Sequence, residues 1–535
     1  MNKLRPNRMG WALILLLCLT LSVSGCFRRA PQKAEADKEA DVVVLGGGGA
    51  GLAAATAAAE KGASVILIEK AAFLGGNTVL AGGAFNAVNP ELQGKEELKQ
   101  ALRDELEEIL EAAEGEFGDF KGTLATLKEQ IQEYFASGET KLFDSVELHM
   151  IHTYLGGKRT DLAGNEIASD FALTKTLCTN APKAKKWLEE HGVEFSDKID
   201  TVLGALWPRT NSVIGMGNAY IKALSEAARA KDVEIMLETR GKELIMEEGK
   251  VVGVKAEDAA GKEITIRAKK GLVMATGGFG ANPEMRAKYN TYWEDLPLEM
   301  PTTNSPHISG DGIVMGEKVG ANLVGMGFIQ LMPSSHPETG SLFSGVWGSA
   351  ETQLFVNKDG RRFVNEYAER DVLSKAALQQ EDALFFIIVD QQIVGDRDIE
   401  VMLERKDIFQ ADTLEELAEM IAVPPENLVA EVEKYNGYVD NQHDPDFGKE
   451  NFGNRIEEPP FVATPRSPAV HHTMGGLQID TEARVLAKDG KPIPGLYAAG
   501  EVTGGIHAGN RLGGNAQADI FVFGRTAGEN AAEGK

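Results

Sequence analysis

The chain has 535 residues, and its 80 acidic and 55 basic side chains give a net charge of −25 at pH 7. This acidic balance argues against a nucleic-acid partner, which needs clustered Lys and Arg. Hydrophobic residues make up 43% and charged residues 25%, as in an ordinary globular protein. Three cysteines are too few for a disulfide framework, whereas 59 glycines indicate close backbone approaches to a large ligand.

The N-terminus has the pattern of a secretion signal. Residues 1–8 are basic without any acid, and residues 11–23 are almost wholly apolar, too short a run to span a bilayer. Cys26 follows the sequence Val-Ser-Gly, which resembles a bacterial lipobox; the alternative is an ordinary signal peptide with an incidental cysteine. We predict a lipoprotein signal peptide over 1–25, a tether over 26–40, and an extracytoplasmic protein anchored to the bacterial membrane through lipidated Cys26.

The next segment has the order of a dinucleotide-binding unit. A β-branched run at 41–45 predicts a buried strand, and it leads into GGGGAG at 46–51, which fits the pattern GxGxxG. An alanine-rich helix at 52–61 and a second strand at 64–68 follow. Glu69 then lies 23 residues after the first glycine, near the spacing of a ribose ligand. This order predicts a pyrophosphate held at the N-terminus of the helix.

Further glycine turns are spread over most of the chain. They include Gly75-Gly76, Gly82-Gly83, the turn after a strand-like run at 273–276, and two C-terminal segments at 495–501 and 510–515. Several turns so far apart suit an extended, bulky cofactor. No second GxGxxG follows a strand, as a separate NAD domain would require. FAD is therefore the predicted cofactor.

Two insertions interrupt the glycine-rich pattern. Residues 91–135 are highly charged with apolar residues at helical spacing, which predicts a solvated helical insertion. Later, strand-like runs at 353–357 and 383–389 precede a helix with a capping box at Thr413 and another helix that begins at Pro424-Pro425. This second insertion predicts a separate α+β domain.

The predicted fold class is therefore α/β, with a Rossmann-like FAD-binding domain and an inserted α+β capping domain. The predicted boundaries are 41–331 for the first part of the FAD-binding domain, with the helical insertion at 91–135, then 332–461 for the capping domain and 462–535 for the second part.

Five motifs carry a family resemblance: LGGGGAGLAAA, ATGGFGAN, GRRFVNEYAERD, HHTMGG and GLYAAGEVTGGIHAGNRLGGNA. With them the sequence resembles the fumarate reductase and succinate dehydrogenase flavoprotein family. It is most similar to the soluble flavocytochrome c branch, which also holds urocanate and methacrylate reductases. The resemblance covers almost the whole chain from residue 41, apart from 91–135. It implies an FAD domain and a mobile capping domain with the substrate between them.

The resemblance also implies roles for individual residues. Arg370 in YAERD matches the arginine that protonates the substrate carbon. Arg511 in NRLGG and His471 match the residues that bind one carboxylate, and Gly514 matches a backbone contact there. The predicted cofactor-binding residues are Gly46, Gly48, Ala50, Gly51, Glu69, Asn77, Thr78, Gly82, Gly83, Asp311, His472, Glu501, Ala516 and Gln517.

Some positions depart from the family pattern. Fumarate reductases hold the second carboxylate with a histidine and a Thr-Glu pair, but here Met332 takes the first position and SGVWGS at 344–349 has no Thr-Glu pair. The arginine that completes the usual proton relay is also missing. His336 is the alternative partner for that carboxylate. Asn77 stands where membrane-complex members carry the histidine bonded to FAD, so we predict non-covalent FAD.

Met332 and Trp347 predict an apolar end of the site, where a second carboxylate would be buried without partners. An α,β-unsaturated monocarboxylate of the acrylate, crotonate or arylacrylate type is therefore expected to outperform fumarate. The sequence shows neither an FMN-attachment domain nor a Cys-x-x-Cys-His haem motif. Electrons are expected from a separate FMN-protein, cytochrome or quinol-linked membrane protein.

The predicted function is an extracytoplasmic FAD-dependent reductase of the C=C bond of an unsaturated carboxylate. The alternatives are an FAD-dependent dehydrogenase or oxidase working in reverse, and an FAD-carrying electron-transfer lipoprotein. Without the resemblance, Arg370 would be a surface ion-pair partner of Glu369 or Asp371, and His471 and His472 would be packing residues. The remaining histidines show no metal-ligand spacing, and no metal site is predicted.

Overall fold

The structure of the chain, a computed structural model, describes residues 36–535. The predicted signal peptide, Cys26 and most of the predicted tether lie outside the described residues. Strand β1 (Lys38–Leu45) begins three residues before the predicted end of the tether, so these three residues belong to the sheet. Within residues 36–535, no helix combines the length and apolar character needed to cross a membrane.

A parallel sheet forms the centre of the FAD-binding domain. Its strands run in the order β20-β11-β1-β2-β8, all parallel to their neighbours. Val43 of β1 pairs with Ile66 on one side and Leu272 on the other, and all three side chains are buried. The strands other than β1 are β2 (Val65–Ile68), β8 (Glu234–Met236), β11 (Glu263–Met274) and β20 (Pro492–Ala498). Antiparallel strands β9 (Arg240–Glu247), β10 (Lys250–Glu257) and β19 (Arg484–Leu486) extend this sheet.

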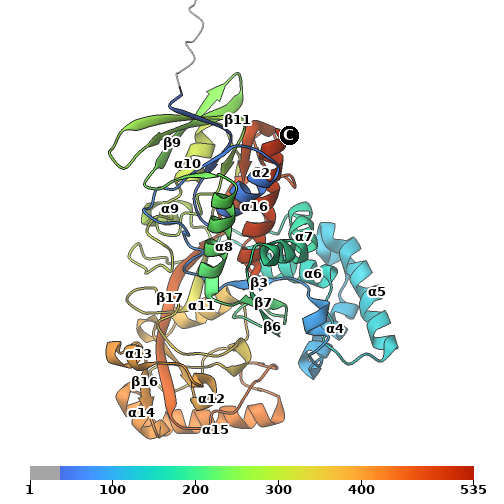
Figure 1. The fold of residues 1–535 in the computed structure, drawn as a ribbon. Coiled ribbons are helices and arrows are strands. Elements are labelled where there is room, and N and C mark those ends of the chain that lie inside the picture. Colours follow the sequence, from blue (N-terminus) through green and yellow to red (C-terminus); the bar gives the residue numbers. More distant parts are fainter. Residues whose placement is uncertain (1–35) are drawn as a thin grey trace, which may run out of the picture. The chain divides into compact units, whose positions relative to one another are not determined.

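Helices α2 (Gly49–Glu60) and α16 (Asn515–Glu533) pack against each other beside this sheet (Figure 1). Small residues permit the close approach. A Cβ added at Gly528 would lie 2.1 Å from the carbonyl oxygen of Ala54, and one at Gly524 would lie 2.7 Å from that of Ala50. The predicted strands at 41–45 and 64–68 and the helix at 52–61 are confirmed, with ends shifted by a few residues.

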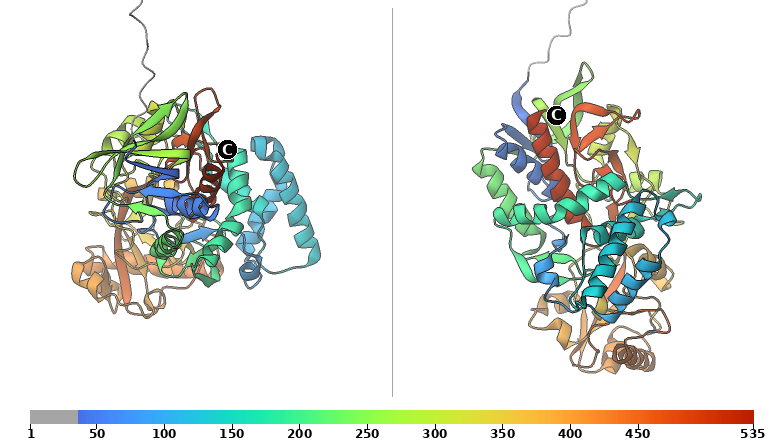
Figure 2. Two further views of the ribbon diagram at one scale, coloured as in Figure 1. Left: turned by 45° about the horizontal axis from the view of Figure 1, so that its top comes forward. Right: turned by 90° about the vertical axis from the view of Figure 1, so that its right-hand side faces the viewer.

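The first insertion is helical, as predicted, but it is not solvated on all sides. Its helices α4 (Gln100–Glu111) and α5 (Lys121–Ser137) lie side by side in the blue and cyan part of Figure 2. Each buries one apolar stripe, which includes Leu106 of α4 and Leu127 of α5, both fully buried. These stripes join the main hydrophobic core through α6 (Val146–Gly157), against which α5 packs. The insertion is therefore a part of the FAD-binding domain's core.

The second insertion contains two apolar clusters of its own. Thr413 caps the helix α14 (Leu414–Met420) at its N-terminus, because its Oγ1 accepts a hydrogen bond of 3.2 Å from the Glu416 backbone N–H, which is one half of the predicted capping box. The other strands and helices are β14 (Leu354–Val356), α11 (Arg370–Leu378), β15 (Phe385–Val389), α12 (Gln391–Val394), α13 (Glu400–Arg405), β16 (Phe409–Ala411) and α15 (Pro425–Asn441).

Strand β17 (Phe461–Thr473) links this second insertion to the FAD-binding domain and is the long strand that runs between them in Figure 1. Its first half, 462–466, pairs with β15, and its second half, 467–473, pairs with β13 (Ile329–Ser335). The predicted boundaries at 331 and 461 therefore fall within or beside paired strands. His471 and His472 lie in the half of β17 that pairs with β13.

Candidate active site

The glycine turn between β1 and α2 requires glycine for steric reasons. Gly46 has a φ of 105°, and an added Cβ would lie 2.3 Å from the carbonyl oxygen of Ala275. An added Cβ at Gly51 would lie 1.9 Å from the carbonyl oxygen of Gly46. The helix that follows has no side-chain cap, so its N-terminus can receive an anion. Gly51 does not line the cavity described below and acts by allowing this close packing.

Glu69 lies at the end of β2, as the sequence predicts. Its Oε2 accepts a hydrogen bond of 2.7 Å from the Gly47 N–H, and its Oε1 accepts one of 2.8 Å from the Ala71 N–H. These bonds fix the carboxylate beside the glycine turn. Each oxygen keeps a further lone pair, which a ribose hydroxyl can use.

One cavity of about 330 Å³ runs from the glycine turn to the capping domain. All of the predicted cofactor-binding residues except Gly51 line it, and so do the four predicted catalytic residues. Arg240 and Asp311, which are hydrogen-bonded to each other, lie in its wall, and residues 332–370 contribute Arg370 and Trp347. The predicted residues in the wall are Gly46, Gly48, Ala50, Glu69, Asn77, Thr78, Gly82, Gly83, Asp311, Arg370, His471, His472, Glu501, Arg511, Gly514, Ala516 and Gln517.

Two arginines converge through one glutamine. Gln330 Oε1 accepts a hydrogen bond of 3.0 Å from Arg511 Nη2 and a longer one of 3.4 Å from Arg370 Nη1. The amide group of Gln330 is itself held, because its Nε2 donates to Asn510 Oδ1 at 2.6 Å and to the Arg511 carbonyl oxygen at 2.7 Å. Nε of Arg511 has no acceptor among the described residues. The two guanidinium groups therefore form a cationic surface that is incompletely neutralised.

Burial shifts the pKa values of Arg370, Arg511 and the nearby His471. Burial lowers the pKa of Arg511 to about 10, and burial together with the charge of Arg511 lowers the pKa of Arg370. Burial and the two arginines also lower the pKa of His471, so its imidazole is neutral near pH 7. Its Nδ1 lies 2.8 Å from Thr303 Oγ1. A carboxylate bound at Arg511 would compensate the buried charge of that arginine.

Arg370 is the first residue of α11 and is held from the FAD-binding side. Its Nε donates a hydrogen bond of 3.1 Å to the carbonyl oxygen of Leu203. A Cβ added at Gly204 would lie 2.8 Å from Arg370 Cγ. The neighbouring Asp371 instead pairs with Arg159, whose Nε lies 2.6 Å from Asp371 Oδ2. The interpretation of Arg370 as a surface ion-pair residue is therefore wrong, because its side chain is buried.

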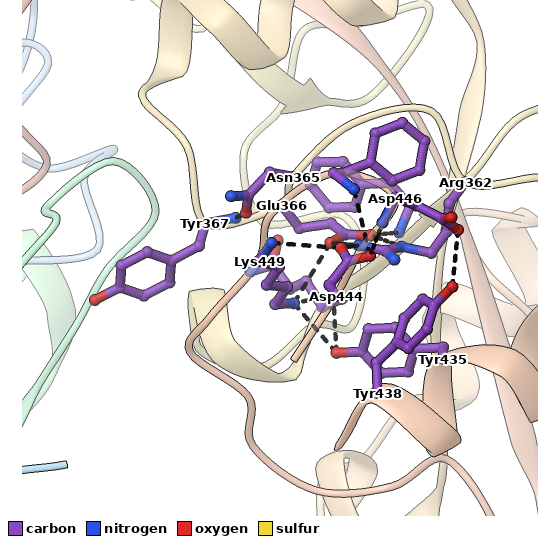
Figure 3. A network of polar contacts seen from close by, with 12 residues as sticks. Arg362, Asn365, Glu366, Tyr367, Tyr435, Tyr438, Asp444, Asp446 and Lys449 are labelled. Atoms are coloured by element: carbon purple, nitrogen blue, oxygen red, sulfur yellow. Dashed lines mark hydrogen bonds and ion pairs between the residues drawn. The ribbon is translucent and has the colours of Figure 1, made fainter. Parts of the chain in front are cut away.

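A buried ionic cluster anchors the segment that leads into α11 (Figure 3). Arg362 donates to both oxygens of Glu366 at 2.9 and 2.8 Å and to Asp444 Oδ2 at 2.9 Å. Lys449 Nζ lies 3.5 Å from Glu366 Oε2, and all four side chains have no exposed surface. We call these four residues the Arg362 cluster. Its two cations and two anions compensate one another and fix Glu366 four residues before Arg370.

A second polar group surrounds Glu501. Glu501 Oε1 accepts hydrogen bonds of 3.0 Å from the backbone N–H and from the hydroxyl of Thr473. Its other oxygen lies 3.6 Å from His472 Nδ1. Burial raises the pKa of Glu501, although the hydrogen bonds from Thr473 and the charge of Arg511 oppose this shift. Burial, Arg511 and His507 lower the pKa of His472, which favours a neutral ring.

One stretch of the chain, residues 332–347, contributes mostly apolar side chains to the cavity wall. Met332, Leu342, Phe343 and Trp347 line the cavity together with Ser334. His336 is not among the wall residues. Its Nε2 lies 3.4 Å from Asp407 Oδ1, so the alternative that His336 replaces the missing charge is wrong. No residue of the 91–135 insertion lines this cavity either, within the described part of the chain.

Sequence reasoning missed Gln330 and Thr303. Gln330 stands two residues before Met332 on β13, and the period of a strand places both on one face. That signal could have indicated Gln330. Thr303 lies in an irregular segment far from His471 in the sequence, and no local pattern relates the two.

Comparison with known proteins agrees with this geometry. The family model described as FAD binding domain matches residues 41–516. NADH:acrylate oxidoreductase of Vibrio harveyi is 48% identical over 509 residues, which cover 93% of this chain and 51% of that protein. Urocanate reductase of Eggerthella lenta is 33% identical over 523 residues, which cover 94% of this chain and 77% of the relative. A solved structure, the open conformation of a flavocytochrome c3 fumarate reductase, has 32% identity and a TM-score of 0.67, covering 94% of this chain and 79% of that one.

The fold and the site thus define an FAD-binding flavoprotein. The wall of the cavity fits this cofactor, because the glycine turn and the free N-terminus of α2 suit a pyrophosphate and Glu69 suits a ribose. The chain belongs to the FAD binding domain family and, within it, to the flavoproteins of the flavocytochrome-type fumarate reductases. It spans about half the length of the Vibrio harveyi relative.

Proposed function

We propose that this protein reduces the C=C bond of an α,β-unsaturated monocarboxylate. The observation that carries the proposal is the pair of buried arginines, Arg370 and Arg511, which meet at Gln330 and line the same cavity as the apolar Met332 and Trp347. A protein that only carries FAD has no use for such a pair. An oxidation in reverse would use the same residues, so the direction is set by the electron donor.

Arg511 and His471 bind the substrate carboxylate in this proposal. The guanidinium of Arg511 is charged at neutral pH and offers its unpaired Nε together with Nη2 as a fork. The neutral imidazole of His471 adds a directional hydrogen bond without a second charge. Negative charge spreads into the carboxylate as the reaction proceeds, so these groups stabilise the transition state more than the ground state.

Arg370 delivers the proton. FAD held at the glycine turn and Glu69 would, when reduced, supply the hydride for the new C–H bond at the β-carbon. The electron pair of the C=C bond then moves to the α-carbon, which takes a proton from the Arg370 guanidinium and gives the saturated acid. Burial and the nearby Arg511 lower the pKa of Arg370, which makes it a stronger acid than an exposed arginine.

The apolar part of the cavity wall determines the class of substrate. In this proposal Met332 and Trp347, which line the cavity, contact the substituent on the β-carbon, where fumarate carries its second carboxylate. Losing the partner of a buried charge costs on the order of 2–5 kcal/mol. A methyl or aromatic substituent gains from burial instead. Acrylate, crotonate and arylacrylates are therefore the proposed substrates, in accord with the similarity to NADH:acrylate oxidoreductase of Vibrio harveyi.

The test is reoxidation of the reduced holoprotein. The FAD is reduced with dithionite under anaerobic conditions, and acrylate, crotonate, cinnamate, fumarate and urocanate are added in separate experiments. We expect rapid return of the oxidised flavin absorbance and formation of the saturated acid with at least one monocarboxylate. Reoxidation by none of the acids would contradict the proposal and favour the electron-transfer alternative.

We also propose that the protein works outside the cytoplasm, anchored through lipidated Cys26, and that a separate electron donor reduces it. The donor is an FMN-protein, a cytochrome or a quinol-linked membrane protein. The basic and apolar N-terminal pattern supports the location. Replacing Cys26 with Ser should move the protein from the membrane fraction to the soluble fraction, and an unchanged distribution would contradict the anchor.

A further inference from the structure

A buried arginine lies behind the apolar part of the cavity wall. Arg466, on β17, has no exposed surface and is not part of the cavity wall, whereas Trp347 is. The guanidinium carbon of Arg466 lies 4.8 Å from the centre of the Trp347 ring. A Cβ added at Gly345 would lie 2.0 Å from Arg466 Nη2, so the backbone of this segment lies directly against the guanidinium. Trp347 therefore covers Arg466 where the substrate would approach.

The cation of Arg466 has few polar partners. Its Nη1 is 3.5 Å from Ser344 Oγ, and its Nε and Nη2 have no hydrogen-bond acceptor among residues 36–535. Asp407 is the one acid that influences its protonation, but that carboxylate pairs with His336. Burial lowers the pKa of Arg466 to about 9, so the group is charged at pH 7. The contact with Trp347 offsets part of the cost of burying this charge.

We propose that Trp347 determines the substrate class by screening Arg466 from the cavity. The indole presents an apolar surface to the β-substituent of the substrate and keeps the guanidinium away from a second carboxylate. Without the indole, Arg466 would offer two unpaired N–H groups to that carboxylate. The inference rests on the proposed function, because it concerns the same part of the same cavity.

Fumarate and crotonate are the matched substrates for the test, since they differ only in the carboxylate or methyl group on the β-carbon. The variants are Trp347→Ala, Trp347→Phe and the double variant Trp347→Ala/Arg466→Met. We expect Trp347→Ala to raise the ratio of kcat/KM for fumarate over crotonate at least tenfold. Trp347→Phe keeps an aromatic cover and should leave the ratio within threefold of wild type. In the double variant, the ratio of kcat/KM for fumarate over crotonate should return toward the wild-type value.

A control distinguishes screening from simple enlargement. Phe343 also lines the cavity and stacks on Trp347 with ring centres 6.4 Å apart, whereas the guanidinium of Arg466 lies over the Trp347 ring. Phe343→Ala enlarges the cavity while the indole stays, so the ratio should change by less than threefold. An equal rise in Phe343→Ala, or a rise that persists in the double variant, would overturn the inference.

Binding of saturated acids tests the same inference without turnover and without a change at Arg466, whose substitution endangers folding. The dissociation constants of succinate and butyrate are measured by calorimetry for the wild-type and Trp347→Ala holoproteins. Succinate should bind at least tenfold more tightly to the variant, and butyrate should not. Parallel changes for both acids would overturn the screening role even if crotonate is a good substrate. Failure of the wild type to reduce any acid would instead contradict the proposed function alone.

Discussion

At the scale of single residues, the account depends on Arg370. Arg370→Ala removes the proton donor and leaves the glycine turn and Glu69 in place. We expect kcat to fall by about 10²–10⁴-fold while FAD stays bound, as general acids contribute rate factors of this size. Arg370→Lys should also fail, because lysine lacks the rigid fork that reaches both Leu203 and Gln330. Steady-state assays with reduced viologen as the electron donor measure kcat. A variant that kept a tenth of wild-type activity would show that another residue donates the proton.

The position of Arg370 depends on a single glycine. Gly204 has a φ of 73°, and an added Cβ would lie 2.8 Å from Arg370 Cγ. Gly204→Ala should therefore displace the guanidinium and lower kcat at least tenfold. Gly164→Ala is the matched control, because Gly164 has a φ of 87° but open space around it. Both variants carry the strain of a left-handed alanine, so equal activities would show that the contact with Arg370 is unimportant.

At the scale of elements, the Arg362 cluster fixes the segment that leads into α11 (Figure 3). Glu366→Gln would leave the cations of Arg362 and Lys449 with Asp444 as their remaining anion in the cluster. Removing one partner from a buried ion pair costs about 3–5 kcal/mol. We expect a clearly lower urea midpoint of the holoprotein and a lower kcat. Glu243→Gln breaks the exposed pair with Lys255 and should leave the midpoint unchanged. Similar midpoints for both variants would contradict a structural role for the cluster.

The elements also show what the sequence alone could predict. The order of β1, glycine turn, α2, β2 and Glu69 followed from local spacing, because each step is set by neighbours in the chain. The convergence of Arg370 with Arg511 followed from family motifs. The Gln330 bridge and Arg466 were not predicted, because their roles depend on pairings of β17 with β13 and β15 that no local pattern specifies. The helical spacing of apolar residues in 91–135 predicted that its helices bury one face. It did not predict that this face packs against α6.

At the scale of the whole molecule, the cofactor should be held without a covalent bond. Asn77 lies in the cavity wall, and its side chain is hydrogen-bonded to Asn304 Oδ1 and to the Ser305 N–H at 2.6 and 2.9 Å. An amide cannot form the bond that a histidine makes with FAD. Acid precipitation of the holoprotein should therefore release all of the flavin into a yellow supernatant. Flavin that stays with the pellet would contradict this prediction.

The central claim is that the site reduces an unsaturated acid with one carboxylate. Its most direct test is a side-by-side assay of the wild-type protein with reduced viologen, in which kcat/KM is measured for acrylate, crotonate and fumarate. Two features of the same cavity predict the outcome: the buried cations of Arg370 and Arg511, and the apolar side chains of Met332 and Trp347 in its wall. We expect kcat/KM for the best monocarboxylate to exceed that for fumarate more than tenfold, as the loss of a charge partner implies. Faster turnover of fumarate than of every monocarboxylate would contradict the account.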